Sequence, residues 1–258
     1  MGIAVIQKRQ RNIALMFILL IILSAGSMQL TEFNLQDAFV AGPNAVLWMI
    51  TNFYPNVESL DNLPSIAAKL KETVFLAIVT TTTASVFALL FALMSTRSNA
   101  ALTVLCRLTA SFFRNVPDTV WAIVLLFSFG QNIVSGYLAL FFATFGFLTR
   151  SFIETIEEAS ASSIEALEAT GATYFQVVFQ AIMPASITQI ISWVLFMLET
   201  NIRNSTLVGM LTGTGIGHLF NLYYKSFDYH SASLVVVLII MVIIAIEYTS
   251  NYIRRVIL

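Results

Sequence analysis

The sequence predicts an all-α integral membrane protein with about six transmembrane helices. Hydrophobic residues make up 58% of its 258 residues, charged residues make up 10%, and the mean hydropathy is +0.84. Soluble domains, by comparison, are about a quarter charged. The apolar residues also gather in stretches close to the length of about 20 residues that crosses a bilayer as a helix. The chain length suits one domain, and the net charge of -1 offers no basic surface for nucleic acid.

The first expected span covers residues 13–30 and follows three basic residues, Lys8, Arg9 and Arg11. This pattern is also typical of a secretory signal peptide, with the stretch SAGS at residues 24–27 as its cleavage site. We expect an uncleaved anchor helix instead, because the apolar run is longer than the usual signal-peptide core of about 7 to 15 residues.

An extracytoplasmic loop is expected between the first and second spans. It covers residues 31–71 and holds no Lys or Arg before Lys69, and its acidic residues are Glu32, Asp37, Glu58 and Asp61. Its apolar middle, residues 38–55, is interrupted by Gly42 and Pro43 and predicts a helix at the membrane surface. The aromatic residues suited to the lipid headgroups there are Trp48, Phe53 and Tyr54. We therefore separate an N-terminal region, residues 1–68, from a membrane domain, residues 69–258.

Five further spans are expected in the membrane domain, and two of them are short. The expected ranges are 73–94, 117–129, 133–152, 185–199 and 233–253. Pro117 ends the preceding amphipathic helix and suits the first turn of the next one. A short span is either tilted and extended by its neighbours, or broken where it lines a cavity.

The distribution of Lys and Arg predicts that both chain termini are cytoplasmic. Cytoplasmic loops carry the excess of these residues, and six alternating spans place most of them on the side of the termini. The residues on that side are Lys8, Arg9, Arg11, Arg97, Arg107, Arg114, Arg150, Arg254 and Arg255. The opposite side receives Lys69, Lys71 and Lys225, with Arg203 near the end of the fifth span. The polar loop after the fourth span is therefore expected to face the cytoplasm.

The chain offers no cluster of residues suited to catalysis or to metal binding. Cys106 is the single cysteine, and the two histidines, His218 and His230, match no metal-ligand spacing. The phosphate-binding pattern G-x-x-x-x-G-K-[ST] is also missing from the sequence. We expect a transport subunit rather than an enzyme, with no cofactor bound by this chain.

A polar stretch after the fourth span predicts a short, separate cytoplasmic helix. Ser162 and Glu165 have the spacing of a capping box, and Gly171 is placed to end the helix in a left-handed turn. The expected helix covers residues 163–170, and a second helix then leads into the fifth span, with Pro184 near a change of direction. Rigid helical turns on the cytoplasmic face indicate a docking element for a soluble partner.

The same stretch, EALEATGATYFQVVFQAIMP, resembles the EAA motif of ABC importer permeases. That motif consists of Glu-Ala-Ala, three residues, Gly and a closing Pro. Glu165, Ala166, Gly171 and Pro184 match it, whereas Leu167 replaces the second Ala. In that family the helix is similar to the coupling helix, which sits in a groove of a cytoplasmic ATP-binding subunit. The resemblance places an EAA-like loop at residues 158–184 and assigns ATPase coupling to Glu165, Ala166, Leu167, Glu168 and Gly171.

A second polar segment, residues 196–217, lies beside the fifth span. A charge at the centre of a bilayer helix costs about 2.5–3.5 kcal/mol, so such residues pair with one another or face a cavity. Glu199 and Arg203 are four residues apart in the favourable order for a helical ion pair. Either they neutralise each other as a structural pair, or the segment lines a transport path and offers donors to an oxyanion. The second interpretation assigns to the path Glu199, Asn201, Arg203, Ser205 and Thr206.

Four glycines follow this segment, at spacings that let backbones approach closely. The string GTGIG is not preceded by a strand, as a dinucleotide-binding fingerprint would be. We therefore expect a helix break and a close-packed turn. The residues assigned to structural turns are Pro117, Pro184, Gly209, Gly213, Gly215 and Gly217.

The polar segment is similar to that of phosphonate-importer permeases. Their pattern is Phe-Glu-x-Asn-x-Arg-x-Ala-Thr-Val-x-Gly, followed by a Gly-rich turn that ends Gly-Ile-Gly. The matching residues are Glu199, Asn201, Arg203, Thr206 and Gly209, and the replacements are Leu198, Ser205 and Leu207. The stretch RNVPDTVWA, residues 114–122, also resembles the start of the third span in that family. The matches run from residue 69 to the C-terminus, and the first 68 residues carry little family signal.

The resemblance implies a type I ABC importer permease subunit in the plasma (inner) membrane of a prokaryote. Its cargo would be phosphonate or a related phosphorus oxyanion, such as phosphite or a phosphate ester. The implied partners are a second permease chain, identical or paralogous, two ATP-binding subunits that hold ATP and Mg, and an extracytoplasmic substrate-binding protein. ATP binding and hydrolysis on those subunits would drive alternating access.

Three alternatives are open at this point. The first is an ABC permease for another small solute, such as methionine. The second is an ion-coupled secondary transporter that uses Glu199 or Glu247 as a proton site, which predicts transport that an uncoupler abolishes and that is insensitive to ATP. The third is a membrane scaffold without transport, in which Arg203→Ala would have no effect.

Overall fold

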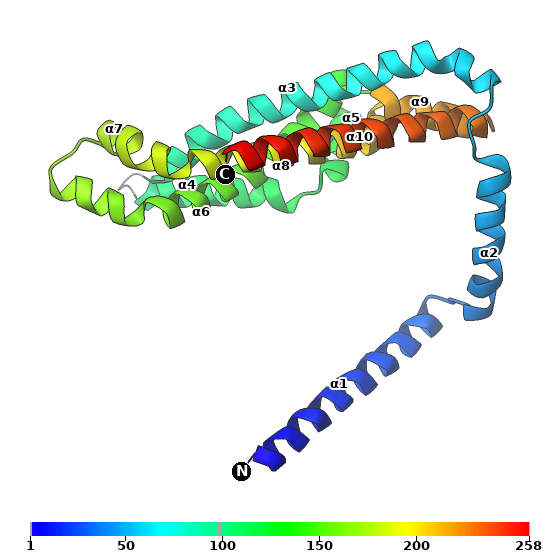
Figure 1. The fold of residues 1–258 in the computed structure, drawn as a ribbon, viewed down its shortest axis with the longest axis horizontal. Coiled ribbons are helices and arrows are strands. Elements are labelled where there is room, and N and C mark those ends of the chain that lie inside the picture. The colour runs from blue at the N-terminus through cyan, green and yellow to red at the C-terminus, as the bar shows by residue number, and fades with distance from the viewer. Residues whose placement is uncertain (1, 97–99, 258) are drawn as a thin grey trace. The chain divides into compact units, whose positions relative to one another are not determined.

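The structure, a computed structural model, describes residues 2–96 and 100–257, and among these residues it contains helices and turns but no strand (Figure 1). Arg97, one of the residues behind the predicted orientation, lies outside the described residues. The chain divides into two compact units, an N-terminal unit, Met1–Phe53, and a C-terminal unit, Tyr54–Leu258.

The N-terminal unit consists of two helices, α1 (Gly2–Leu30) and α2 (Leu35–Asn52). No residue of the apolar stretch 6–30 is buried, as suits a helix that meets lipid or another chain. Helix α2 begins after Asn34, whose side chain accepts a hydrogen bond from the Gln36 backbone N–H at 3.0 Å. It continues through Pro43, so the helix expected within residues 38–55 is present.

The C-terminal unit contains the remaining helices of the described chain. In order they are η1 (Glu58–Asn62), α3 (Leu63–Ser95), α4 (Ala100–Asn115), α5 (Asp118–Phe129), α6 (Ile133–Ala169), α7 (Tyr174–Val177), the π-helical turn η2 (Val178–Ile182), α8 (Met183–Thr212), α9 (Gly215–Lys225) and α10 (Tyr229–Ile257).

Five helical stretches of the described chain are long and apolar enough to cross a membrane, namely residues 6–30, 58–95, 133–159, 174–212 and 229–256. Helices α4 and α5 form a sixth if they are counted as one span bent by 88°. The prediction of about six spans in an all-α membrane fold is therefore confirmed. The fifth predicted span is longer than expected, because α8 remains helical over 30 residues, through its polar segment to Thr212.

Helix α6 lies at the centre of the C-terminal unit, where it packs against α3, α4, α5 and α8. Its buried residues Phe145, Leu148 and Phe152 meet a row of small residues on α3, which are Ala84, Ala88 and Ala92. Alanine at every fourth position lets two helix backbones approach closely in a membrane protein. A separate buried cluster joins the N-terminal end of α3 to α9 and α10 through Ile66, Ile216, Leu234 and Val235.

The bend between α4 and α5 is fixed by Pro117 and by the neighbouring helix α6. The carbonyl of Pro117 accepts hydrogen bonds from the backbone N–H groups of Val120 and Trp121, at 3.0 and 3.1 Å, and so starts α5. Gly146 of α6 leaves room for the end of α4, since a Cβ at that position would lie 2.4 Å from the backbone nitrogen of Arg114.

The separate short helix that we expected at residues 163–170 is not present. Helix α6 runs without a break from Ile133 to Ala169, so Ser162 and Glu165 lie inside a helix and form no capping box at its start. The sequence contains no Gly or Pro between Gly146 and Gly171 that would end the helix earlier.

The change of direction expected near Pro184 lies earlier, at residues 170–173, between α6 and α7. Residues 174–212 form one continuous helical run. Proline lacks the N–H that an α-helix needs. The chain accommodates it with the π-helical turn η2, in which the N–H of Met183 bonds to the carbonyl of Val178, five residues back.

Candidate functional site

The turn between α6 and α7 presents the residues that resemble the EAA motif, at the end of the bundle opposite to α9 (Figure 1). Glu165, Ala166, Glu168 and Gly171 are exposed. Leu167 is half-buried and packs against the apolar core between α3 and α6. The structure therefore turns two carboxylates to the surface and uses the one residue that departs from the motif as an internal anchor.

The turn itself is a Schellman motif around Gly171. The N–H of Ala172 bonds to the carbonyl of Leu167 at 3.2 Å, and the N–H of Gly171 bonds to the carbonyl of Glu168 at 2.9 Å. Gly171 has φ of 80°, which glycine adopts without the strain that a Cβ would cause. These bonds satisfy the last carbonyls of α6 and fix the direction in which the chain leaves it.

The next helix starts with a capping pair that the sequence analysis missed. The side-chain oxygen of Gln176 accepts hydrogen bonds from the backbone N–H and the hydroxyl of Thr173, at 2.7 and 3.0 Å. The hydroxyl of Tyr174 donates to the carbonyl of Leu93 at 2.5 Å. The turn is therefore tied to the end of α3 as well as to α6.

Two hollows flank this turn. One is apolar, about 210 Å³, and lies between the end of α3 and the exposed rings of Phe175 and Phe179. The other is about 450 Å³ and is lined by Glu165 together with the ion pair between Arg107 of α4 and Glu157 of α6. The exposed surface around the turn thus combines aromatic rings with carboxylates.

Asn201 of α8 is 1% exposed and joins three helices of the C-terminal unit. Its side-chain oxygen accepts a hydrogen bond from the hydroxyl of Thr144 on α6 at 3.0 Å. Its side-chain nitrogen donates to the hydroxyl of Thr81 on α3 at 2.8 Å. Both functions of the amide are used inside the bundle, so this polar residue holds α3, α6 and α8 together.

Glu199 and Arg203 form the ion pair that their spacing predicts, with 3.0 Å between Oε1 of Glu199 and Nη2 of Arg203. The Glu199 side chain is 16% exposed, whereas the Arg203 side chain is 55% exposed. A second arginine, Arg254 of α10, approaches the other carboxylate oxygen to 4.0 Å. Arg203 and Arg254 were expected on opposite sides of the membrane, and their meeting at one carboxylate shows that this placement is wrong for at least one of them.

Ser205 and Thr206 turn their side chains into the protein. The hydroxyl of Ser205 donates to the carbonyl of Ile202 at 2.8 Å, one turn earlier in α8. The hydroxyl of Thr206 is buried and makes no hydrogen bond within the described part of the chain. Of the residues assigned to the path, Arg203 is therefore the one with an exposed polar group.

The glycine-rich stretch forms the tight connection between α8 and α9. Gly213 ends α8 with φ of 72°. A Cβ on Gly217 would lie 1.9 Å from the carbonyl oxygen of Thr206, and one on Gly209 would lie 2.4 Å from that of Thr214. The first turn of α9 therefore packs directly on the backbone of α8.

The N-terminus of α9 is capped by side chains from α3 that the sequence analysis did not assign. Oε1 of Glu72 accepts a hydrogen bond from the Gly215 N–H at 3.1 Å, and the hydroxyl of Thr73 accepts one from the Ile216 N–H at 2.8 Å. Lys69 pairs with the other oxygen of Glu72 at 2.6 Å. A carboxylate is stabilised at this position because a helix N-terminus carries partial positive charge.

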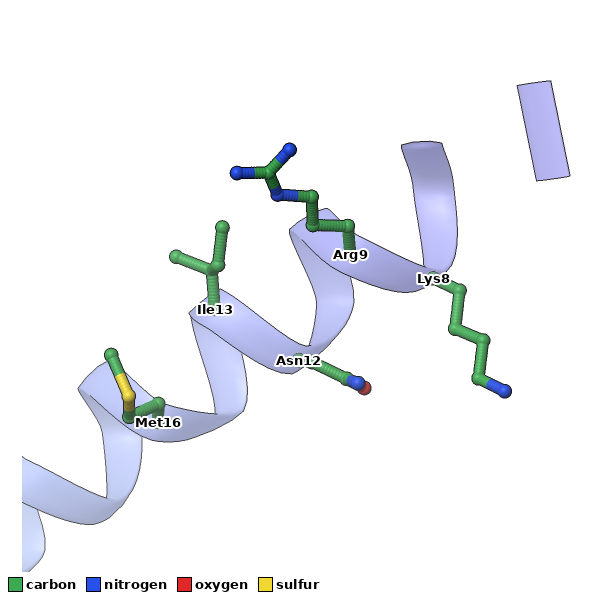
Figure 2. Close-up of a pocket in the computed structure, with 5 residues that line it drawn as sticks. All are labelled: Lys8, Arg9, Asn12, Ile13 and Met16. Carbon is green, nitrogen blue, oxygen red and sulfur yellow. The ribbon is translucent and has the colours of Figure 1, made fainter. Parts of the chain in front are cut away.

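The basic end of α1 is a helix surface rather than a binding site. Figure 2 shows that the side chains around a hollow of about 390 Å³ all come from successive turns of this one helix and extend away from it; they are Lys8, Arg9, Asn12, Ile13 and Met16.

Within the described residues, no group of three or more His, Cys, Asp or Glu side chains could hold a metal ion.

The turn after α6 and the polar segment of α8 are two distinct regions of the C-terminal unit. The continuous helical run of residues 174–212 links them, and Glu199 lies about 38 Å along it from Tyr174 at 1.5 Å per residue. The polar segment presents an exposed cation, Arg203, beside the Glu199 carboxylate.

Comparison with known proteins relates these features to a family. The family described as "Binding-protein-dependent transport system inner membrane component" matches residues 84–257. This range includes the whole turn after α6, the polar segment of α8 and the connection to α9.

Similar curated proteins carry names of phosphorus-compound permeases. The putative phosphite transport system permease protein HtxC of Stutzerimonas stutzeri is 24% identical over 256 residues, which are 98% of this chain and 89% of that protein. The phosphate-import permease protein PhnE of Mycolicibacterium smegmatis is 26% identical over 224 residues, or 86% of this chain. The chain spans 42% of the length of PhnE and 56% of the putative phosphite permease HtxE of Stutzerimonas stutzeri.

Solved structures of transporters share the fold. A crystal structure of an amino acid ABC transporter with histidines superposes with a TM-score of 0.67 at 16% identity, over 77% of this chain and 97% of that chain. An inward-facing structure of the MetNI methionine ABC transporter gives 0.66 at 22% identity, over 75% and 96%. At this identity the likeness concerns the fold alone.

Proposed function

Because the chain belongs to the family of binding-protein-dependent transport system inner membrane components and is a multi-pass permease subunit of an ABC importer, we propose that it forms the membrane path for phosphonate or a related phosphorus oxyanion. The similarity to named phosphite and phosphate permeases, which in one case extends over 98% of this chain, carries the proposed substrate class. Family membership argues against the two alternatives outside the ABC class, the ion-coupled carrier and the scaffold.

The proposed complex contains a second permease chain, two cytoplasmic ATP-binding subunits and an extracytoplasmic substrate-binding protein. ATP and Mg would be bound by the ATP-binding subunits, and hydrolysis there would drive import. The turn after α6 is the proposed docking point for these subunits. Support comes from the exposed carboxylates of Glu165 and Glu168 and from a turn fixed both to α6 and to α3.

Within the polar segment, we assign the contact with the anion to Arg203. Its guanidinium is the exposed cationic group of the segment, and a guanidinium offers paired N–H donors that match the oxygens of a phosphonate or phosphite. Asn201 and Ser205 have a structural role in the proposed path. The Asn201 amide bonds to the neighbouring helices α3 and α6, and the Ser205 hydroxyl bonds to the backbone of α8.

Growth on single phosphorus sources tests the substrate class. A strain that lacks the gene is supplied with methylphosphonate, phosphite, glycerol phosphate or inorganic phosphate, and the intact gene is returned on a plasmid as the control. We expect growth to fail on at least one of the first three sources and to return with the plasmid. Unchanged growth on all of them, together with reduced methionine uptake, would transfer the assignment to the methionine class.

Co-purification tests the docking point. The tagged chain is isolated from its native membrane as wild type, as a Glu165→Ala, Gly171→Pro variant, and as Glu58→Ala, an exposed change in η1 away from the turn. Proline cannot adopt the positive φ of Gly171, so the turn is disrupted in the second protein. We expect an ATP-binding subunit to accompany wild type and Glu58→Ala but not the turn variant, at equal membrane levels. Retention by all three would remove the docking assignment.

A further inference from the structure

Glu199 lies between two arginines that come from different helices. Its Oε1 accepts a hydrogen bond from Arg203, four residues further along α8, at 3.0 Å. Its Oε2 faces Nη2 of Arg254, near the end of α10, at 4.0 Å. A single carboxylate is therefore shared between a cation on its own helix and one on a neighbouring helix.

Arg254 is the less well satisfied of the two arginines. Its side chain is 26% exposed, and its Nε and Nη2 atoms are buried without a hydrogen bond to any described residue. Buried N–H groups that lack an acceptor are costly, and more so when they carry charge. The Glu199 carboxylate is about 1 Å beyond hydrogen-bonding distance from Arg254, so a small side-chain rotation would satisfy the guanidinium.

The three charges do not cancel. Among the described residues, two guanidinium groups and one carboxylate give this group a net charge of +1, and Arg203 lies on its exposed side. If Glu199 and Arg203 were only a neutral structural pair, a third charge beside them would add cost without benefit. An anion that enters next to Arg203 would neutralise the group.

We propose that Arg254 is a positioning residue that competes with Arg203 for the Glu199 carboxylate and so makes Arg203 available to an anionic substrate. This inference rests on the proposed function. When Glu199 bonds to Arg254, the guanidinium of Arg203 can donate to the oxyanion. When the oxyanion leaves, Glu199 bonds to Arg203 again. The carboxylate then competes with the next anion for this guanidinium, so the anion is not bound too tightly.

The test measures uptake of the phosphorus compound as a function of its concentration, in cells that contain the whole complex. Arg254→Gln should raise the apparent KM about tenfold, the effect of weakening one charge-assisted hydrogen bond, and change the maximal rate much less. Arg254→Lys should recover part of the loss, because it restores the charge. The matched control is Arg255→Gln, which removes the same charge from the next, exposed position and should leave KM unchanged.

A second variant separates positioning from a general structural role. Adding Glu199→Gln to Arg254→Gln removes the charge that holds Arg203, so the KM of the double variant should return toward that of the wild type. If Arg254 only stabilised the fold, the second substitution would not restore KM. An unrestored KM, or equal effects of Arg254→Gln and Arg255→Gln, would overturn the proposal.

A readout without substrate keeps this proposal distinct from the proposed function. The unfolding temperatures of Glu199→Gln, Arg254→Gln and the double variant, measured in detergent on the intact complex, give the coupling between the two residues. We expect this coupling to grow in an Arg203→Gln background, where the competitor is missing. Additive shifts in both backgrounds would overturn the shared carboxylate, whereas coupling in a chain that imports no phosphorus compound would overturn only the proposed substrate class.

Discussion

Oε1 of Glu72 accepts a hydrogen bond from the backbone N–H of Gly215 at 3.1 Å, across 143 positions of sequence. A carboxylate on α3 thus caps the first turn of α9, where the helix carries partial positive charge. The Glu72 carboxylate also pairs with Lys69, so it links a cation on its own helix to the backbone at the start of α9.

Replacing Glu72 by alanine should destabilise the protein. The substitution leaves the Gly215 N–H without an acceptor, which costs about 1–3 kcal/mol for a buried or partly buried group. The unfolding temperature in detergent should fall accordingly. Glu58→Ala is the matched control, because Glu58 is exposed and its change should leave that temperature within error. Equal effects of the two variants would show that the cap contributes nothing.

Gly217→Ala should prevent normal folding of the connection between α8 and α9. The added Cβ would lie 1.9 Å from the carbonyl oxygen of Thr206 and 2.8 Å from the Met210 nitrogen, so the two helices would have to separate. Overpacking of this kind costs about 1–3 kcal/mol or more. Immunoblots of membranes should show a strong loss of the chain. Gly26→Ala, which meets no atom within 4 Å, should accumulate normally.

Two neighbouring threonines of α3 should respond differently to replacement by valine. Thr81→Val removes the acceptor of the Asn201 amide and should cost about 1–3 kcal/mol. Thr82→Val removes an exposed hydroxyl that, among the described residues, bonds to the Ile78 carbonyl of its own helix, and should cost about 0.5 kcal/mol or less. Chemical or thermal unfolding in detergent compares them. A larger effect at Thr82 would contradict the role given to Asn201.

Gly171 should tolerate asparagine better than alanine. The space around its Cα is open, so the cost of alanine comes only from the φ of 80°, about 1–2 kcal/mol. Asparagine adopts this conformation more readily. The amount of ATP-binding subunit that co-purifies should therefore decrease in the order Gly, Asn, Ala. If alanine retained as much as glycine, the left-handed turn would not matter for docking.

The membrane spans could be predicted from sequence, because the thickness of the bilayer requires apolar stretches of about 20 residues. The polar turns were harder. Ser162–Glu165 and Thr173–Gln176 both have capping-box spacing, yet only the second pair follows a real break, which Gly171 makes. Residues 147–170 hold Ala, Glu and Leu without Gly or Pro, and helix propensity over that length outweighs one local capping pattern.

The partners of the polar residues could not be predicted. Asn201 was grouped with the path residues as one polar side chain among several, but its partners, Thr144 and Thr81, lie 57 and 120 positions away. The approach of Arg254 to Glu199 likewise depends on how α10 packs on α8. Such long-range contacts leave no periodicity or spacing in a single sequence, so only the three-dimensional structure reveals them.

The unbroken course of α6 has a mechanical consequence. Its 37 residues make a rod of about 55 Å, longer than the hydrocarbon thickness of about 30 Å. Phe152, in the middle of the bundle, and Glu165, near the tip, belong to the same rod, without a joint between them. A sideways displacement of the tip would therefore be carried along the helix to its buried half, where Phe152 packs in the core.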